Sequence, residues 1–472
     1  MLNGRRISTL KLLQQPEYLF CVLALLFGVV YAVLVPAFLG NDEGRHFRRA
    51  ISISHGGFLM EPVQVAGGII NALNVFEAFE RAHLESSSDP SASISTQTYL
   101  TNVSAIALDP AVEKELNPNF LAVYSPITYV VQSASMRIGL LVNATPMELL
   151  NIARLSGMVA AIFLTALAIR IMPSHRYLLC ALALLPAMVY TRSTLNADQL
   201  TNAVAFLFIA LVLRESLKTD RLPRQTLFSL AFLAFVLAQM KSGYVLLPLF
   251  AFAIPGIRFS SVKQRLLAIA FIVIPGITAM LAWLLYVKFM YFTDTASYQT
   301  GSGLAIPGDQ LRFILNNPLD YIAIVARTLF LTDFAFKHLR EMISSLTIAV
   351  PAPLPVFAVM AALMGLLLLS AQENSQKAGY SLLSKLLGAG IFSGTLLFNL
   401  TLLYVHWTAY QEPLIHGFQG RYLFPVLPLL LLFAPQRQRA LVALSPAKLV
   451  VSLSAMGFFA GYLTLMGWRD GV

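Results

Sequence analysis

The chain has 472 residues, of which 57% are hydrophobic and only 12% are charged, whereas about 25% of the residues in a soluble domain are charged. Its mean hydropathy is +0.71, and a soluble fold of this length would need far more polar surface, so a soluble globular protein is excluded. The net charge of +10 resides on Lys and Arg residues between apolar segments, a placement typical of membrane orientation and not of a nucleic-acid groove. Cys21 and Cys180 both lie inside apolar runs, which excludes a disulfide framework and a zinc site.

The first apolar run, from Pro16 to Phe38, is longer than the core of a signal peptide and is not followed by a clear cleavage site, so we expect a retained signal anchor. Apolar segments recur along the rest of the chain and predict an all-α polytopic bundle of about eleven spans. This bundle is expected to form a single transmembrane domain over residues 1–472. Several spans are short, which predicts helices that break or stop early around an internal cavity. The expected spans are Glu17–Leu39, Leu149–Ile171, Tyr177–Tyr190, Asp198–Leu217, Thr226–Met240, Tyr244–Ile257, Leu266–Tyr286, Leu346–Leu369, Ser381–Tyr404, Tyr422–Ala434 and Leu449–Met466.

Basic residues mark one set of short loops, and by the positive-inside rule these loops are cytoplasmic. The N-terminus is then cytoplasmic and the C-terminus external, as expected for a multi-pass protein of a bacterial inner membrane. Residues 40–120 and 288–345 become long external loops, with juxtamembrane helices on that side. The marking residues are Arg5, Arg6, Lys11, Arg170, Arg176, Arg214, Lys218, Arg221, Arg224, Arg258, Lys263, Arg265, Lys377, Lys385, Arg437, Arg439 and Lys448.

This topology requires that Leu121–Val142 does not cross the membrane. Ser125, Thr128, Gln132 and Ser135 recur at helical spacing and form a polar face, with apolar side chains on another face. Such a pattern favours a helix that lies in the membrane interface or re-enters. The alternative is a spanning helix whose polar stripe lines a cavity.

The first external loop opens with an acidic motif, Gly40-Asn41-Asp42-Glu43-Gly44-Arg45-His46. Adjacent carboxylates at the membrane surface, where the local dielectric falls, are readily tuned for general-base work or for holding a divalent cation. We expect Asp42 to be the general base, Glu43 to be its partner or a metal ligand, and His46 to orient them. The alternative is a solvated cluster of juxtamembrane charges.

Further polar breaks are expected on the same face of the membrane. In Thr191–Asp198, Arg192 and Asp198 suit an anion and a polar ligand, although Asp198 equally suits the N-cap of the next helix. In Lys241-Ser242-Gly243-Tyr244, Lys241 is a cation at membrane depth. Such a cation indicates a functional site, unless its side chain snorkels to the surface.

Near the end of the chain, Gln419-Gly420-Arg421-Tyr422 precedes a span that contains prolines. Arg is the side chain that best clamps phosphate with two hydrogen bonds, and Arg154, early in its own span, is another candidate. One topology places these cations and the acidic motif on one membrane face. Sugar transfer from a phosphate-linked lipid needs this combination, because a carboxylate deprotonates the acceptor hydroxyl while cations stabilise the departing phosphate.

The layout resembles the GT-C class of membrane glycosyltransferases, which use polyprenyl-phosphate sugars. An acidic motif after the first span, a juxtamembrane helix with residues like Tyr124-Ser125-Pro126 and a second outer motif like Thr191–Asp198 fit that class. Within it, the chain is most similar to a bacterial polytopic membrane family of unknown function. That family is marked by Asp-Glu-x-x-His after the first span and Gln-Gly-Arg-Tyr-x-x-Pro near the end, which Asp42–His46 and Gln419–Pro425 match. Gly40-Asn41 stands where the family usually has Pro.

The resemblance implies a glycosyltransferase that moves a sugar from a polyprenyl-phosphate donor to a glycan, lipid or cell-wall acceptor on the external face, with inversion. Mg²⁺ or Mn²⁺ is a candidate cofactor, and no nucleic-acid partner is expected. One rival is a transporter or flippase of a lipid-linked glycan, which is expected to show inverted repeats that we do not see in the sequence. Another is a non-catalytic assembly protein of the envelope. Arg192, Lys241 and Arg421 would hold the phosphate, and the remaining substrate-binding candidates are Tyr124, Arg154, Asp198, Gln419 and Tyr422.

Overall fold

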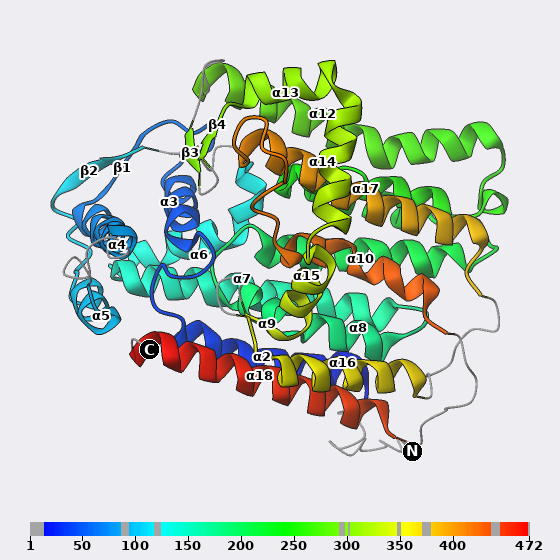
Figure 1. Cartoon of the computed structure of the whole chain (residues 1–472), viewed down its shortest axis with the longest axis horizontal. Helices are drawn as coiled ribbons and strands as arrows, with labels where there is room; N and C mark the ends of the chain where they lie inside the picture. Colours follow the sequence, from blue (N-terminus) through cyan, green and yellow to red (C-terminus); the bar gives the residue numbers. More distant parts are fainter. Residues whose placement is uncertain are drawn as a thin grey trace, which may run out of the picture.

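The computed structural model describes residues 14–85, 94–117, 124–291, 298–300, 303–346, 351–370, 379–435 and 444–470. These residues form a bundle of helices, with short helices and strands gathered at one end (Figure 1). Among the described helices, 6 are long and apolar enough to cross a membrane, which supports a polytopic helical membrane protein. They are α2 (Pro16–Leu34), α7 (Pro146–Ile171), α10 (Asp198–Ser216), α12 (Val262–Tyr291), α17 (Leu382–His406) and α18 (Pro446–Asp470).

Shorter apolar helices account for most of the other expected spans, and several of them are wound as 3₁₀ helices. The 14 residues of η7 extend over roughly 28 Å at the 3₁₀ rise of about 2.0 Å per residue, which is close to the hydrocarbon thickness of about 30 Å. Pro425 and Pro428 lie inside η7 and disfavour an α-helix there, because proline lacks the N–H that an α-helix needs. The helices of this group are α11 (Arg224–Met240), η4 (Ser242–Tyr244), η5 (Leu247–Ala253), η6 (Gly256–Arg258), α16 (Leu354–Leu369) and η7 (Gly420–Phe433). The count of spans and the side of each loop stay predictions.

The expected span Tyr177–Tyr190 is interrupted in the structure. It is divided into α8 (Arg176–Ala183) and α9 (Pro186–Ser193), because Pro186 cannot supply the N–H that would continue the first helix. The carbonyl oxygen of Ala183, at the end of α8, accepts a hydrogen bond from Arg192 Nη2 at 3.0 Å. Arg192 therefore supplies a hydrogen bond to a carbonyl at the end of α8 that has no donor within the helix.

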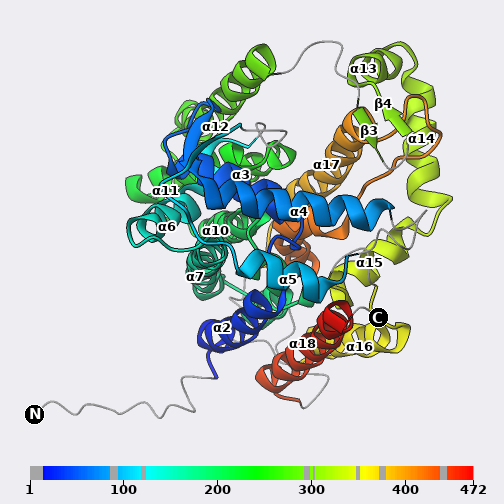
Figure 2. The same ribbon diagram turned by 90° about the vertical axis from the view of Figure 1, so that its left-hand side faces the viewer.

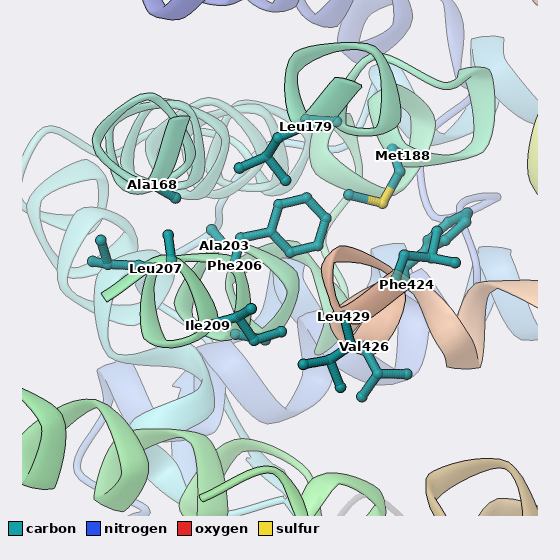
Figure 3. Close-up of a cluster of buried hydrophobic side chains, with 14 of the residues drawn as sticks. Ala168, Leu179, Met188, Ala203, Phe206, Leu207, Ile209, Phe424, Val426 and Leu429 are labelled. Carbon is teal, nitrogen blue, oxygen red and sulfur yellow. The ribbon is translucent and has the colours of Figure 1, made fainter. Parts of the chain in front are cut away.

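Helix α10 lies at the centre of the bundle. In its most apolar stretch 89% of the residues are buried, against 28% in α17, so α10 is surrounded by protein while α17 presents much of its surface outward. Figure 3 shows Phe206 and Ile209 of α10 beside Phe424 and Val426 of η7. This packing fixes η7, and the motif at its start, against the central helix.

Residues 40–85 and 94–117 form much of the group of short elements at one end of the bundle, seen end-on in Figure 2. Phe38, Phe47, Phe76 and Tyr99 form part of a buried core within this group, separate from the main core. Its two strands pair antiparallel, with Val63 opposite Leu116, and neither strand was expected in an all-α fold. The elements are α3 (Glu43–Ser54), β1 (Val63–Ala66), α4 (Gly67–Glu85), α5 (Thr96–Ser104) and β2 (Glu113–Leu116).

The segment after the first outer loop forms η3 (Pro126–Tyr129) and α6 (Val130–Leu141); residues 118–123 lie outside the described residues. The 12 residues of α6 rise about 18 Å, which is shorter than the hydrocarbon of about 30 Å. Gln132 on its polar face donates to Gln199 Oε1 of α10 at 2.7 Å. The polar face therefore packs against the bundle, and the expectation that the segment does not cross stays a prediction.

The second long loop was expected to begin at Lys288, but α12 continues to Tyr291. Beyond it the chain forms short strands and helices, among which α14 runs across the direction of the long helices (Figure 1). These elements are β3 (Tyr298–Thr300), β4 (Gly303–Ala305), α13 (Pro307–Asn316), α14 (Pro318–Phe330) and α15 (Phe334–Ser344). The last of them, α15, packs against the start of η7 and so reaches the motif at Arg421.

Candidate functional site

A fully buried ion pair between Glu43 and Arg154 joins the segments that build the site. Both oxygens of Glu43 accept from Arg154, with Nε to Oε1 at 2.8 Å, and the backbone N–H of Leu195 donates to Oε1 at 2.7 Å. Arg154 also donates to the carbonyls of Val35 and Pro36 beyond the end of α2. One carboxylate thus ties the acidic motif to α7 and to the Thr191–Asp198 turn, and its lone pairs are occupied.

Gly40 allows these segments to approach closely. A Cβ at Gly40 would lie 2.9 Å from Thr194 Cβ and 3.0 Å from Glu43 Cδ, both shorter than ordinary contacts. The N–H of Gly40 also donates to Glu43 Oε2 at 3.3 Å. Gly40, the first residue of the Gly40-Asn41 pair, therefore packs directly against the Thr191–Asp198 turn.

Asp42 is the least constrained carboxylate of the site. Its backbone is left-handed, with φ of 55°, a conformation that Asp tolerates better than most residues. Its side chain is 52% exposed, and its nearest cations are Arg421 Nη2 at 3.8 Å and Arg45 Nη1 at 3.7 Å. These distances exceed hydrogen-bond length, so the carboxylate keeps lone pairs for another group.

Lys241 and Asp198 form a second ion pair, with Nζ 2.7 Å from Oδ1. The Lys241 ammonium also lies 4.9 Å from the ring centroid of Tyr422, a cation–π contact. Asp198 is the first residue of α10, whose N-cap is Ala197, so the alternative that Asp198 caps the helix is wrong. The pair instead joins the start of α10 to the break after α11.

The Tyr124-Ser125-Pro126 segment is held at the end of α11, next to Lys241. Ser125 Oγ donates to the carbonyl of Gln239 at 2.9 Å, and Thr128 Oγ1 donates to that of Met240 at 3.3 Å. These carbonyls belong to the last turn of the helix, which has no intrahelical donors for them. The ring of Tyr124 then lies 5.8 Å from that of His46.

His46 is buried beside these charges, and its Nδ1 lies 2.6 Å from the hydroxyl of Tyr129. Burial lowers the pKa of His46 to about 4. The carboxylates of Asp42 and Asp198 act in the opposite direction, and Arg421 and Lys241 lower the pKa further. The imidazole is therefore neutral at physiological pH.

Arg421 is 11% exposed, and its buried Nε has no hydrogen-bond partner among the described residues. The preceding Gly420 is fixed by α15, because its N–H donates to Glu341 Oε2 at 2.8 Å. His338 Nδ1 lies 3.0 Å from the same oxygen. A Cβ at Gly420 would lie 2.8 Å from the carbonyl oxygen of His338, so this close approach requires glycine.

The structure brings most of the sequence-predicted residues together and separates others from them. Arg192 lies apart, with its guanidinium 5.1 Å from the ring of Phe20 near the start of α2, whereas Asp42 follows the end of that helix. Gln419 is half-buried beside the cluster, as the N-cap of η7. Glu43 and Arg154 lie behind the cluster as a closed pair. The site cluster itself consists of Asp42, His46, Tyr124, Asp198, Lys241, Arg421 and Tyr422.

Sequence reasoning missed residues that contact this cluster. Tyr129 lies three residues after Pro126 and contacts His46. Tyr244 ends the Lys241-Ser242-Gly243-Tyr244 segment, and its hydroxyl donates to the carbonyl of Tyr422 at 3.1 Å. Both tyrosines stand next to residues that the sequence analysis singled out, but nothing in the sequence distinguishes them from tyrosines of an ordinary core. Glu341 and His338 come from the second long loop, where no local pattern marks them.

The described residues do not fit a divalent-cation site. Among the described residues, no three side chains of His, Cys, Asp or Glu lie close enough together to bind one metal ion. Of the three carboxylates in the predicted motifs, Glu43 and Asp198 are engaged by Arg154 and Lys241, and only Asp42 has free oxygens among the described residues. A divalent cation prefers several oxygen ligands, and the single free carboxylate of Asp42 does not supply them.

An open pocket of about 330 Å³ lies on the other side of Arg154, between the end of α2, α5 and the start of α7. Val35, Leu100, Met147 and Arg154 are among its lining residues. The nitrogens of Arg154 are bonded to Glu43 and to carbonyls, so the polar groups left in this pocket are those of Gln97, Thr101, Ser104 and Asn151. It is distinct from the cluster around Asp42.

No curated protein and no solved structure matches this chain. The family described as predicted membrane protein DUF2142 matches residues 25–430. That stretch contains both marker motifs and every residue of the site cluster. The chain therefore belongs to the DUF2142 family of predicted membrane proteins.

Proposed function

We propose that this protein is a glycosyltransferase that moves a sugar from a polyprenyl-phosphate donor to a hydroxyl of a glycan, lipid or cell-wall acceptor on the external face of the membrane. The observation that carries the proposal is the pairing of the loosely held carboxylate of Asp42 with the buried guanidinium of Arg421, 3.8 Å away. A carboxylate with free lone pairs accepts a proton, and a guanidinium with a free donor binds phosphate. Sugar transfer from a lipid phosphate uses both groups.

In the proposed reaction Asp42 accepts the proton of the acceptor hydroxyl while that oxygen bonds to the anomeric carbon of the sugar. The bond from this carbon to the phosphate oxygen breaks, and its electron pair leaves with the polyprenyl phosphate. Arg421 and Lys241 stabilise the negative charge that develops on the phosphate. The proton passes from Asp42 to water. The acceptor oxygen attacks the anomeric carbon from the side opposite the leaving phosphate, so the anomeric configuration inverts.

The other two carboxylates of the predicted motifs support this assignment, because both are engaged by cations. Glu43 is saturated by Arg154, Gly40 and Leu195, and Asp198 is paired with Lys241. Glu43 and Arg154 are therefore positioning residues that hold the acidic motif against α7. Asp198 orients Lys241, whose other N–H donors have no hydrogen-bond partner among the described residues and would be available to a phosphate.

The test is the lipid content of a strain that lacks the gene. We expect this strain to accumulate a polyprenyl-phosphate sugar, detected by mass spectrometry of extracted lipids, and the wild-type gene to remove it. Asp42→Asn keeps the shape and the left-handed backbone but cannot accept a proton, so transfer should fall by about 10²–10⁴-fold. The accumulated lipid should then persist.

The matched control is Asp109→Asn. Asp109 also has a left-handed backbone, with φ of 52°, and its carbonyl accepts from Gly67 beside the β1–β2 pair. This variant should restore transfer fully. A normal lipid profile in the deletion strain, or complete rescue by Asp42→Asn, would contradict the proposal.

A further inference from the structure

His46 of the site cluster forms a buried pair with Tyr129, and the proposed reaction leaves both without a role. Nδ1 of His46 lies 2.6 Å from Oη of Tyr129. His46 is 5% exposed and Tyr129 is 0% exposed. Within the described part of the chain, neither the tyrosine hydroxyl nor Nε2 of the histidine has another hydrogen-bond partner.

This isolation decides which atom is the donor. If Nδ1–H donated to Oη, the hydroxyl hydrogen of Tyr129 would be buried without an acceptor, which is costly. If the hydroxyl donates to Nδ1, that hydrogen is satisfied and the neutral ring carries its own hydrogen on Nε2. Burial keeps both groups neutral in either arrangement, because it lowers the pKa of His46 to about 4 and raises that of Tyr129 well above its usual value. The unsatisfied hydroxyl hydrogen therefore decides between them.

The Nε2–H group then lies in a cluster of paired charges. The charged groups that act on His46 are Asp42, Asp198, Arg421 and Lys241. Asp198 is engaged by Lys241 at 2.7 Å, and His46 bonds to neither carboxylate. A phosphate bound by Arg421 and Lys241 would bring acceptor oxygens to this group, and a neutral donor adds a hydrogen bond without changing the balance of charge.

We propose that Tyr129 is a positioning residue that fixes the Nε2–H tautomer of His46, and that His46 thereby donates a hydrogen bond to a phosphate oxygen of the polyprenyl-phosphate donor. His46 is then a neutral donor, rather than a group that orients Asp42 and Glu43. The phosphate contact rests on the proposed function, whereas the tautomer does not.

Binding of a polyprenyl phosphate to the purified full-length protein tests the contact. A glutamine amide nitrogen reaches the position of Nε2, whereas that of asparagine reaches the position of Nδ1. We expect His46→Gln to stay within about threefold of the wild-type Kd and His46→Asn to weaken binding about tenfold, the scale of one hydrogen bond. Tyr129→Phe frees the tautomer and should weaken binding by a smaller factor. Equal affinities of the His46→Gln and His46→Asn variants would overturn the contact.

A spectroscopic measurement tests the tautomer without any ligand. In ¹⁵N NMR of histidine-labelled protein, the His46 signals are those lost in His46→Gln. We expect a protonated Nε2 and an unprotonated Nδ1 in the wild type, and a mixture of tautomers in Tyr129→Phe. A protonated Nδ1 in the wild type would overturn the role of Tyr129. Failure of the proposed function appears instead as a deletion strain without the accumulated lipid, whatever the tautomer.

Discussion

At the scale of single residues, Arg421 separates a phosphate-binding role from that of a membrane anchor. An arginine that anchors a helix at headgroup level can be replaced by lysine, because both side chains reach the surface with their charge. A planar guanidinium that binds phosphate through two N–H groups cannot. Arg421 has a buried Nε without a partner among the described residues, which favours the second role.

We therefore predict that Arg421→Lys weakens the binding of a polyprenyl-phosphate sugar to purified protein by more than about tenfold, or roughly 1.4 kcal/mol. Arg312→Lys is the matched control, because Arg312 is 79% exposed and pairs with Asp309 on α13. Its affinity should equal that of the wild type. Unchanged affinity in Arg421→Lys would leave the anchor role standing and assign the phosphate to Lys241.

The sequence was sufficient to select residues that the structure brings together, but not to decide their partners. Asp42 and Arg421 stand in short polar motifs at the ends of apolar segments, so their placement on one site could be predicted. Glu43 and Arg154 looked equally suited to chemistry, yet each saturates the other. Arg192 satisfies a helix end at Ala183, and only the break before Pro186 explains it. These roles depend on which segments meet, which no single motif encodes.

At the scale of elements, α15 connects the second long loop to the motif at the start of η7. Gly420→Ala would place Cβ 2.8 Å from the carbonyl of His338 and from Met342 Cγ. Such overpacking costs about 1–3 kcal/mol and would displace Glu341 from the Gly420 N–H. We predict a lower thermal unfolding temperature of the purified protein and weaker binding of polyprenyl phosphate.

Gly390→Ala is the control for this substitution. Gly390 lies within α17, and a Cβ there would meet nothing within 4 Å. Alanine favours a helix over glycine by about 0.8–1.0 kcal/mol, so this variant should be as stable as the wild type or more stable. Equal unfolding temperatures for Gly420→Ala and the wild type would show that α15 does not hold η7 tightly.

The helices themselves illustrate what periodicity can predict. Long apolar segments such as α7 and α17 begin and end close to their expected bounds, because length and composition determine them. The expected span Tyr422–Ala434 is one of the short ones, a group expected to break or stop early, whereas the 3₁₀ winding of η7 extends it. Hydropathy gives the number of apolar residues in a segment but not the rise per residue of its helix. The length in Å of η7 could therefore not be predicted from the sequence.

At the scale of the whole molecule, the two ends of α10 carry different chemistry. Asp198 at one end belongs to the site cluster. Near the other end, Glu215 accepts from the fully buried Arg258 at 2.6 Å, and Arg214 and Lys218 add further cations to the same carboxylate. The 19 residues of α10 extend about 28 Å, close to the thickness of the hydrocarbon, so we expect the two groups to lie at opposite surfaces of the membrane.

Basic residues favour the cytoplasmic side, so the end of α10 near Leu217 should be cytoplasmic and the site cluster external. We predict that a reporter fused after Leu217 reads as cytoplasmic, while one fused after Gln411, in the loop before Arg421, reads as external. Each fusion serves as the control for the other, since both should be expressed at similar levels. An external signal at Leu217 would place Asp42 and Arg421 in the cytoplasm, and transfer from a donor on the external face would then be impossible.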